Sequence, residues 1–267
     1  MNIVLVHGFL GFREKYGIEY FRGVAEHFRA KSLKVLVPEL DPIRGIAFRG
    51  GQLRDQIVAA YKTGDLDPNE QNHIIAHSMG GLDSRFILSP VNPGRIQIPV
   101  RSLTTISTPH RGSPIADILD RPELLNPFPH LAFGPRGRPV DDALDAMGTS
   151  SNGLRDLTTA ACTEFSAKYL DDPAVAYFSV AGRGRERFPF TAAALIQFYS
   201  YIGALTGELN DGLVSVPSAQ WGTFDPETWP ADHAEEVGHN LDNMSVPPAF
   251  PYLAKYDQIA DRAANLT

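Results

Sequence analysis

Short apolar runs rich in β-branched residues recur along the chain and alternate with segments of helical periodicity. The apolar runs span residues 3–6, 33–37, 73–76, 103–107 and 175–181. Runs this short, bounded by turn residues, predict buried strands. Apolar residues at helical spacing lie between the first two runs (Ile18, Phe21, Ala25, Phe28) and between the next two (Leu53, Ile57, Ala60, Tyr61). The alternation predicts an α/β fold, in which a mostly parallel central sheet carries helices on both faces and functional residues gather at the carboxyl ends of the strands.

Two segments interrupt this alternation. Residues 111 to about 160 are rich in Pro, Gly, Leu and Phe, and residues 188–205 are apolar and aromatic. We interpret both as insertions over the sheet that form a lid or cap, with ordinary core packing as the alternative for the second. A helical pattern between residues 248 and 264 predicts the last helix. The length of 267 residues fits a single α/β domain, 1–267, that carries these insertions.

Charge and cysteine content exclude several classes of function. The chain has 24 Lys and Arg against 31 Asp and Glu, a net charge of −7 without a basic stripe, so we expect no nucleic-acid partner. Cys162 is the single cysteine, which excludes an internal disulfide and a thiolate metal cluster. No run approaches the roughly 20 apolar residues of a spanning helix. The N-terminus shows no leader pattern, which favours a cytoplasmic location; the mature form of a secreted enzyme is the alternative.

Residues 73–81 combine an apolar strand, a small-x-Ser-x-Gly turn and the start of a helix that continues to residue 88. A nucleophile elbow requires this strand-turn-helix context. The small residues Ala76 and Gly80 let the two backbones approach closely, and Ala76 stands where glycine is commoner. The helix N-terminus beneath Ser78 favours a developing anion. The segment therefore predicts Ser78 as a nucleophile.

The loop after the first strand, residues 7–11, has the sequence His-Gly-Phe-Leu-Gly. Its two glycines free the backbone to turn an NH group inward, and acyl transfer needs two such donors aimed at the carbonyl oxygen. We predict that the backbone NH groups of Phe9 and Met79 form this oxyanion hole. His7 precedes the nucleophile and lies beside the loop, so we interpret it as a residue that stabilises the loop.

An acid and a base follow Ser78 in the order expected for this fold. A serine hydroxyl needs a histidine base that a carboxylate orients, and the acid is expected before the histidine. Asp211 lies in a Gly-containing turn, and His233 follows in a late loop. We predict that these two residues complete the triad, with His239 as the rival base and a turn-forming role as the alternative for Asp211. His110 is expected in the pocket wall.

Together these motifs resemble the bacterial triacylglycerol lipases, the group that includes the Pseudomonas, Burkholderia and Bacillus enzymes. The resemblance rests on residues 7–9, 76–81, 106–112, 210–214 and 232–237, which occur in the family's order and cover most of the chain. It implies an α/β-hydrolase fold and a serine-dependent carboxylic ester hydrolase that cleaves acyl esters, such as acylglycerols, through an acyl-enzyme. It also implies a helical lid over an apolar groove, a lipid ester substrate and contact with a lipid-water interface.

The resemblance also bears on metals, because many of these lipases carry a structural calcium beside the catalytic histidine loop. Glu235 matches one family ligand position, and Asn240 falls where one branch has an aspartate. A neutral amide weakens calcium binding, since affinity rises with the number of charged oxygen ligands. We therefore expect no required cofactor, with a structural calcium as an open alternative. The zinc-binding insertion of the thermophilic branch has no clear counterpart here, so no zinc is expected.

Two other functions stay open at this point. An acyltransferase on the same scaffold would pass the acyl group to an alcohol instead of water. A catalytically silent protein of the same fold would bind without reacting, although every triad and oxyanion position is filled. The residues do not separate a lipase from a short-chain esterase.

Overall fold

The computed structural model describes residues 1–11, 19–121, 152–185 and 191–266. The strands are β1 (Asn2–Val6), β2 (Lys34–Leu36), β3 (Asn72–His77), β4 (Ser102–Ile106), β5 (Ala176–Val180) and β6 (Thr223–Phe224). The helices are α1 (Val24–Ala30), α2 (Ile46–Thr63), α3 (Met79–Leu88), α4 (Pro114–Asp120), α6 (Asn152–Asp156), α7 (Thr159–Lys168), α8 (Ile196–Thr206), α9 (Val216–Ala219), the 3₁₀ turn η2 (Glu235–Val237) and α10 (Tyr252–Ala264).

The six strands form one sheet in the order β2-β1-β3-β4-β5-β6, and all neighbours are parallel. This confirms the predicted α/β architecture and all five predicted strands. The chain passes from β1 outward to β2 and then returns to the other side of β1 with β3. The loops that leave β1 and β3 therefore diverge at neighbouring strand ends, where ligands bind in open parallel sheets.

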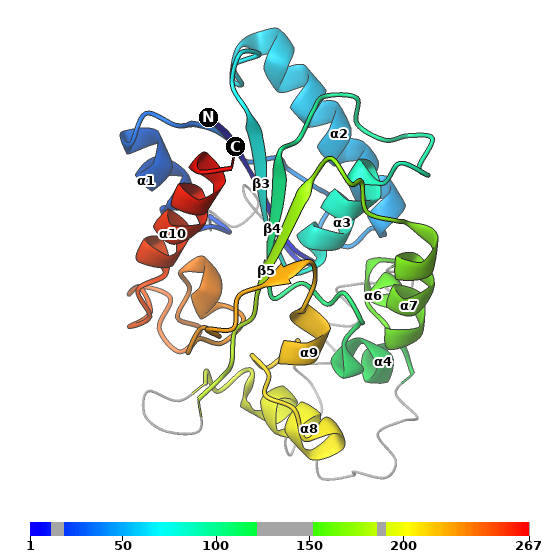
Figure 1. The fold of residues 1–267 in the computed structure, drawn as a ribbon. Helices are drawn as coiled ribbons and strands as arrows, with labels where there is room; N and C mark the ends of the chain where they lie inside the picture. Colours follow the sequence, from blue (N-terminus) through cyan, green and yellow to red (C-terminus); the bar gives the residue numbers. More distant parts are fainter. Residues whose placement is uncertain (12–18, 122–151, 186–190, 267) are drawn as a thin grey trace.

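Helices cover both faces of the sheet (Figure 1). On one face α1 and α10 pack together. The sequence of α10 favours a helix that buries one side, because its buried residues recur at helical spacing: Tyr252, Tyr256, Ile259, Ala260 and Ala263. On the other face α2 and α3 cover the sheet, and Leu53 and Ile57 belong to one buried cluster with the strand residues Val4 and Ile74. The two apolar layers bury the central strands on both sides, which explains their continuous apolar sequence.

The predicted start of the first helix is wrong, and part of the predicted lid lies outside the described residues. The first helix begins at Val24 rather than near residue 18, because Gly23 has a φ of 67° and interrupts any helix that would include it. Phe21 is nevertheless buried, in the segment before the helix. Residues 122–151 and 186–190 lie outside the described residues, so the lid stays a prediction; α4, α6, α7 and α8 account for the described parts of both insertions.

No helix in the described part of the chain combines the length and apolarity needed to cross a membrane.

Candidate active site

Ser78 lies in the sharp turn between β3 and α3. Its backbone has φ 55° and ψ −133°, a region that residues other than glycine rarely adopt and that costs about 1–3 kcal/mol. The surrounding structure compensates: the Ser78 NH donates to the Ile106 carbonyl at 3.0 Å, and the Ser78 carbonyl accepts the Thr108 hydroxyl at 2.7 Å. Both contacts come from β4 or the turn after it. The neighbouring strand thus holds the strained turn in place.

Glycines at two positions let the backbones around Ser78 approach closely. A Cβ on Gly80 would lie 2.4 Å from the Val6 carbonyl oxygen at the end of β1. A Cβ on Gly8 would lie 2.6 Å from Ser78 Cβ and 3.1 Å from Ser78 Oγ. The loop after β1 therefore lies directly against the Ser78 side chain, as the strand order requires.

Two backbone donors predicted for the oxyanion hole have no partner in the described residues. The NH of Met79 belongs to the first turn of α3, where helices leave such groups unpaired. The NH of Phe9, in the loop against Ser78, also donates to no acceptor among the described residues. Two unpaired NH groups beside one serine are what stabilisation of a tetrahedral oxyanion requires.

Buried polar contacts stabilise the loop of residues 7–11, which carries the predicted oxyanion donor Phe9. His7 Nε2 accepts the Leu40 NH at 3.0 Å and its Nδ1 donates to the Gly8 carbonyl at 2.9 Å, so the imidazole is neutral. Arg49, which is ion-paired at 2.8 Å with Asp83 in the interior, donates to the His7 carbonyl at 2.7 Å. Burial and the nearby Arg49 charge lower the pKa of His7 to about 4. These contacts fit the interpretation of His7 as a residue that stabilises the loop.

The lowered pKa of His7 predicts a loss of stability in acid. Between pH 6.5 and about 4, His7 is protonated in the unfolded chain, where its pKa is near 6.5, but stays neutral in the folded chain. The unfolded chain therefore binds more protons over this range. The contribution of His7 is therefore complete above pH 6.5 and falls toward pH 4, by up to about 1.4 kcal/mol per pH unit. Urea unfolding across this range should show the free energy of unfolding of wild type falling relative to His7→Gln. A constant difference would contradict a neutral, buried His7.

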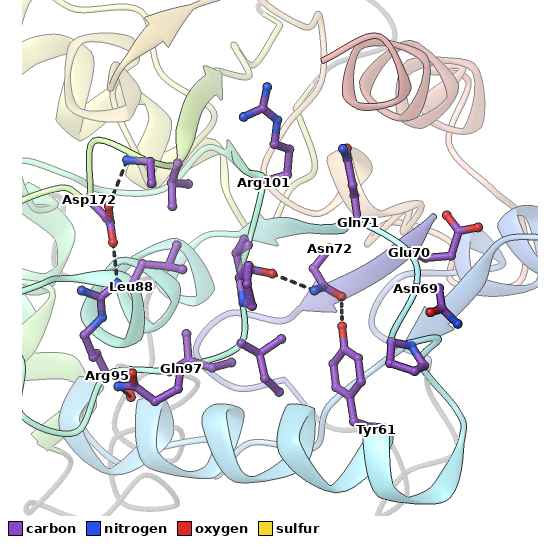
Figure 2. A pocket seen from close by; sticks show the side chains of 17 residues that line it. Tyr61, Asn69, Glu70, Gln71, Asn72, Leu88, Arg95, Gln97, Arg101 and Asp172 are labelled. Atoms are coloured by element: carbon purple, nitrogen blue, oxygen red, sulfur yellow. Dashed lines mark hydrogen bonds and ion pairs between the residues drawn. The ribbon is translucent and has the colours of Figure 1, made fainter. Parts of the chain in front are cut away.

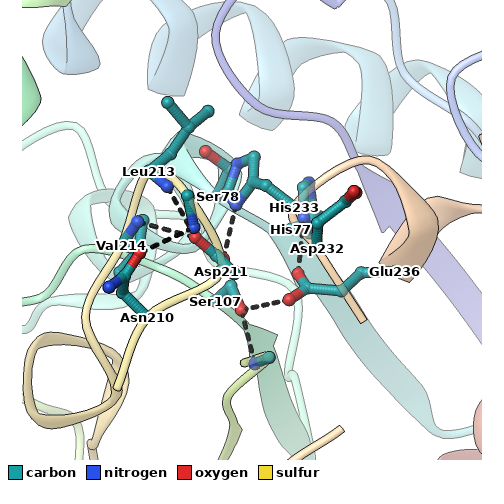
Figure 3. A network of polar contacts seen from close by, with 12 residues as sticks. His77, Ser78, Ser107, Asn210, Asp211, Leu213, Val214, Asp232, His233 and Glu236 are labelled. Carbon is teal, nitrogen blue, oxygen red and sulfur yellow. Dashed lines mark hydrogen bonds and ion pairs between the residues drawn. The ribbon is translucent and has the colours of Figure 1, made fainter. Parts of the chain in front are cut away.

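Asp211, in the loop between α8 and α9, lies beside His233, in the loop between β6 and η2 (Figure 3). His233 Nδ1 donates to Asp211 Oδ2 at 2.7 Å, while Asp211 Oδ1 accepts the NH groups of Leu213 and Val214 at 2.8 and 2.7 Å. Gly212, with φ 101°, permits the turn that brings those two donors round to the carboxylate. The Asp211 side chain is fully buried, so the bond to His233 is shielded from water. The His233 ring lies 4.4 Å, centroid to centroid, from the ring of His77, the residue before Ser78.

The other two candidate histidines have different partners. His239 Nε2 bonds to the carbonyl oxygens of Glu19 and Tyr20 at 2.8 and 3.0 Å, so it contacts no carboxylate there. His110, expected in the pocket wall, is buried against Trp221, with the rings stacked at 5.1 Å, and bonds to Thr105. The structure thus brings His233, and not the rival base His239, to Asp211.

A buried carboxyl group next to this pair was not singled out from the sequence. Glu236 Oε2 lies 2.9 Å from His77 Nε2, and its Oε1 accepts the Ser107 hydroxyl at 2.7 Å. Burial, and then the charge of Asp211, raise the pKa of Glu236 well above its usual range. Ligand atoms of His77, His233 and Glu236 lie within 4.8 Å of one another. The sequence could have pointed to Glu236 only through its position three residues after His233. Its partner His77 is 159 residues away along the chain, so no local pattern reveals the contact.

The two residues considered for calcium do not present a free oxygen set. Both oxygens of Glu235 accept from Arg185 Nη2, at 2.5 and 2.7 Å, and one also accepts the Asp232 NH. The side-chain oxygen of Asn240 accepts backbone NH groups two and three residues further along the chain. A cationic guanidinium at the Glu235 carboxylate repels a metal ion. These side chains, as arranged, do not fit a calcium site.

A separate pocket of about 680 Å³ lies at the other end of the sheet (Figure 2). Its lining includes Asn72 and Arg101, at the amino ends of β3 and β4, whereas Ser78 follows the carboxyl end of β3. Figure 2 shows Tyr61 bonded to Asn72 and Arg95 paired with Asp172 at its wall. Its described lining contains no serine, cysteine or histidine. This pocket therefore lacks the chemistry of the Ser78 site.

Comparison with known sequences identifies relatives of this chain, although no family model matches it. Triacylglycerol lipase 2 of Saccharomyces cerevisiae is 30% identical over 225 residues, which are 82% of this chain and 62% of that protein. A triacylglycerol lipase of Vibrio cholerae is 26% identical over 97% of this chain and 86% of its own length. A Burkholderia plantarii triacylglycerol lipase is 38% identical over 125 residues, 44% of this chain and 32% of that protein. The chain thus spans less than two thirds of the yeast relative.

Solved structures show the same fold. Staphylococcus hyicus lipase superposes with a TM-score of 0.73 at 20% identity, over 99% of this chain and 95% of that one. A metagenomic carboxyl esterase gives a TM-score of 0.73 at 21% identity, over 99% of this chain and 75% of that one. Below 25% identity these matches show the fold alone, which confirms the predicted α/β-hydrolase fold. With the sequence relatives, they show that the chain is a distant homologue of bacterial and fungal triacylglycerol lipases, which share the α/β-hydrolase fold.

Proposed function

We propose that the chain is a serine-dependent carboxylic ester hydrolase in which Ser78, His233 and Asp211 form the catalytic triad. The observation that carries the proposal is the 2.7 Å bond from His233 Nδ1 to the buried Asp211 carboxylate, in a chain whose Ser78 occupies a strained strand-to-helix turn. An imidazole whose Nδ1 is bound to a carboxylate has Nε2 available as the base. The names of the relatives, triacylglycerol lipases, agree with this chemistry.

The mechanism follows from these roles. His233 Nε2 removes the Ser78 proton as Oγ attacks the ester carbonyl, and the NH groups of Phe9 and Met79 stabilise the oxyanion. The imidazolium then donates its proton to the leaving alcohol, which leaves an acyl-enzyme. Water, deprotonated by the same imidazole, attacks the acyl group, and the returning proton releases Ser78. Asp211 fixes the tautomer and stabilises the imidazolium charge in both halves.

Apolar side chains beside the triad support an acyl substrate. The described residues of α4 and α8 form a cluster that includes Ile115, Ile118, Tyr201 and Ile202, and Leu213 of the Asp211 turn packs against it. Leu10 in the oxyanion loop and Leu209 before the Asp211 turn are exposed, 38% and 53%. Apolar surface at both loops suits an acylglycerol presented at a lipid-water interface. We therefore favour acylglycerols with medium or long acyl chains as substrates.

Hydrolysis of p-nitrophenyl esters from acetate to palmitate, and of an emulsified triglyceride, tests this proposal. Cleavage of long-chain esters and of the triglyceride is the expected result, because the exposed side chains of Leu10 and Leu209 offer apolar surface to an acyl chain. Cleavage of short esters alone would retain the triad and refute the acylglycerol preference. No cleavage of any ester, with no labelling of Ser78 by a fluorophosphonate, would refute the ester hydrolase itself.

A further inference from the structure

Arg185 connects the loop that carries His233 to the segment that follows β5. Its Nη2 donates to both oxygens of Glu235, at 2.5 and 2.7 Å, and its Nη1 donates to the Pro230 carbonyl at 2.6 Å. Pro230 and Glu235 lie on either side of His233, so one guanidinium contacts both ends of this loop. The pair is largely shielded, with side-chain exposures of 18% for Arg185 and 10% for Glu235.

The loop has more negative charge than its own residues neutralise. Asp232 and Glu235 are both buried, and Asp232 accepts the NH groups of Ala234, Glu235 and Ala192. Those bonds shape the turn but supply no full positive charge. Arg185 is the cation that contacts either carboxylate among the described residues. Removing it would leave the buried Glu235 carboxylate without its counter-charge, next to the buried Asp232 carboxylate.

The segment that carries Arg185 also contacts the loop of Asp211, through the backbone of Gly184. The Arg185 NH donates to Thr191 Oγ1 at 2.7 Å, and the NH of the preceding Gly184 donates to the Asn210 carbonyl at 2.6 Å. Asn210 precedes Asp211. The same short segment therefore contacts the loop of the acid through its backbone and the loop of the base through the Arg185 side chain.

The atoms that Arg185 contacts are oxygens that a hard divalent cation also accepts as ligands. They are the two carboxylate oxygens of Glu235 and the carbonyl oxygen of Pro230. We infer that Arg185 replaces a divalent cation in holding the His233 loop, so that this chain needs no metal there. The inference rests on the proposed role of His233 as the base. It assigns Arg185 as a positioning residue, which acts through the loop and contacts no reacting atom.

Melting temperatures of four proteins, each in EDTA and in millimolar calcium, test the inference. These are wild type, Arg185→Gln, the double variant Arg185→Gln/Glu235→Gln, and the matched control Arg183→Gln, which removes the same charge from an exposed side chain two residues away. We expect wild type and Arg183→Gln to melt alike under both conditions. Arg185→Gln should melt about 4–8 °C lower in EDTA and recover part of the difference in calcium. The double variant should not respond to calcium, because the Glu235 carboxylate is gone.

Kinetics add a second readout. Arg185→Gln should lower kcat about 10- to 100-fold with KM little changed, and calcium should restore part of kcat. Destabilisation of wild type by EDTA, or equal melting of Arg185→Gln and Arg183→Gln, would overturn the inference. So would an Arg185→Gln protein that melts low but ignores calcium, since that indicates an ordinary ion pair. The melting measurements can be repeated in Ser78→Ala, so their outcome is independent of the proposed hydrolysis.

Discussion

Ser78→Ala should reduce kcat for a p-nitrophenyl ester by about 10⁵-fold or more, because loss of the nucleophile removes the acyl-enzyme route entirely. The residual rate should reflect only the oxyanion donors and substrate binding. Alanine removes one oxygen from a residue that is 8% exposed, so the melting temperature should stay close to that of wild type. Steady-state kinetics, thermal unfolding and fluorophosphonate labelling measure the three effects.

A second serine in the same helix provides the control for this substitution. Ser84 is buried in α3 and donates its hydroxyl to the Gly80 carbonyl at 2.7 Å, within the helix. Ser84→Ala should therefore change kcat by less than about tenfold while it costs about 1 kcal/mol of stability. Equal loss of activity in both variants, or an active Ser78→Ala, would contradict Ser78 as the nucleophile.

His233→Asn should reduce kcat by about 10⁴- to 10⁶-fold, because the base that removes the Ser78 proton is lost. Asparagine still donates to the Asp211 carboxylate, so the loop should stay folded and the melting temperature should change little. The pH dependence of the residual rate should also lose the inflection of an imidazole base. Kinetics over a range of pH values, with melting curves at the same values, separate the catalytic effect from an effect on folding.

His239→Asn is the matched control, with the same exchange six residues along the chain. His239 bonds to the carbonyl oxygens of Glu19 and Tyr20, so its replacement affects packing near the Tyr20 segment. We expect a lower melting temperature and a kcat within about tenfold of wild type. If instead His239→Asn were inactive and His233→Asn active, the assignment of the base would be wrong.

The sequence predicts the central part of this fold well, because local apolar patterns are enough to identify buried parallel strands. The runs at 3–6, 73–76 and 103–107 became β1, β3 and β4 almost residue for residue. The last strand, β6, has two residues and carries no such pattern, so it was not predicted. The first helix was placed too early, since Ile18 and Phe21 continue its apolar spacing, whereas Gly23 ends that continuity in the backbone.

Site residues could be recognised from the sequence where a short local motif surrounds them. Ser78 and Asp211 each stand in such a motif, and the structure brings Asp211 to His233. The residues that support them depend on contacts that no local pattern reveals. Glu235 meets Arg185 across 50 positions, and Arg49 reaches the His7 carbonyl across 42. The sequence alone allowed a calcium site at Glu235, because Arg185, which contacts the Glu235 carboxylate, lies 50 positions away along the chain.

The residues of the proposed triad lie in segments that differ in how firmly the sheet holds them. Ser78 follows β3, which has a paired strand on each side, whereas Asp211 lies in the loop between α8 and α9 and His233 in the loop after the two-residue edge strand β6. Edge loops open at lower free energy than central strands. Denaturant should therefore abolish activity before the central sheet unfolds, through a folded form that has kept its nucleophile and lost its base.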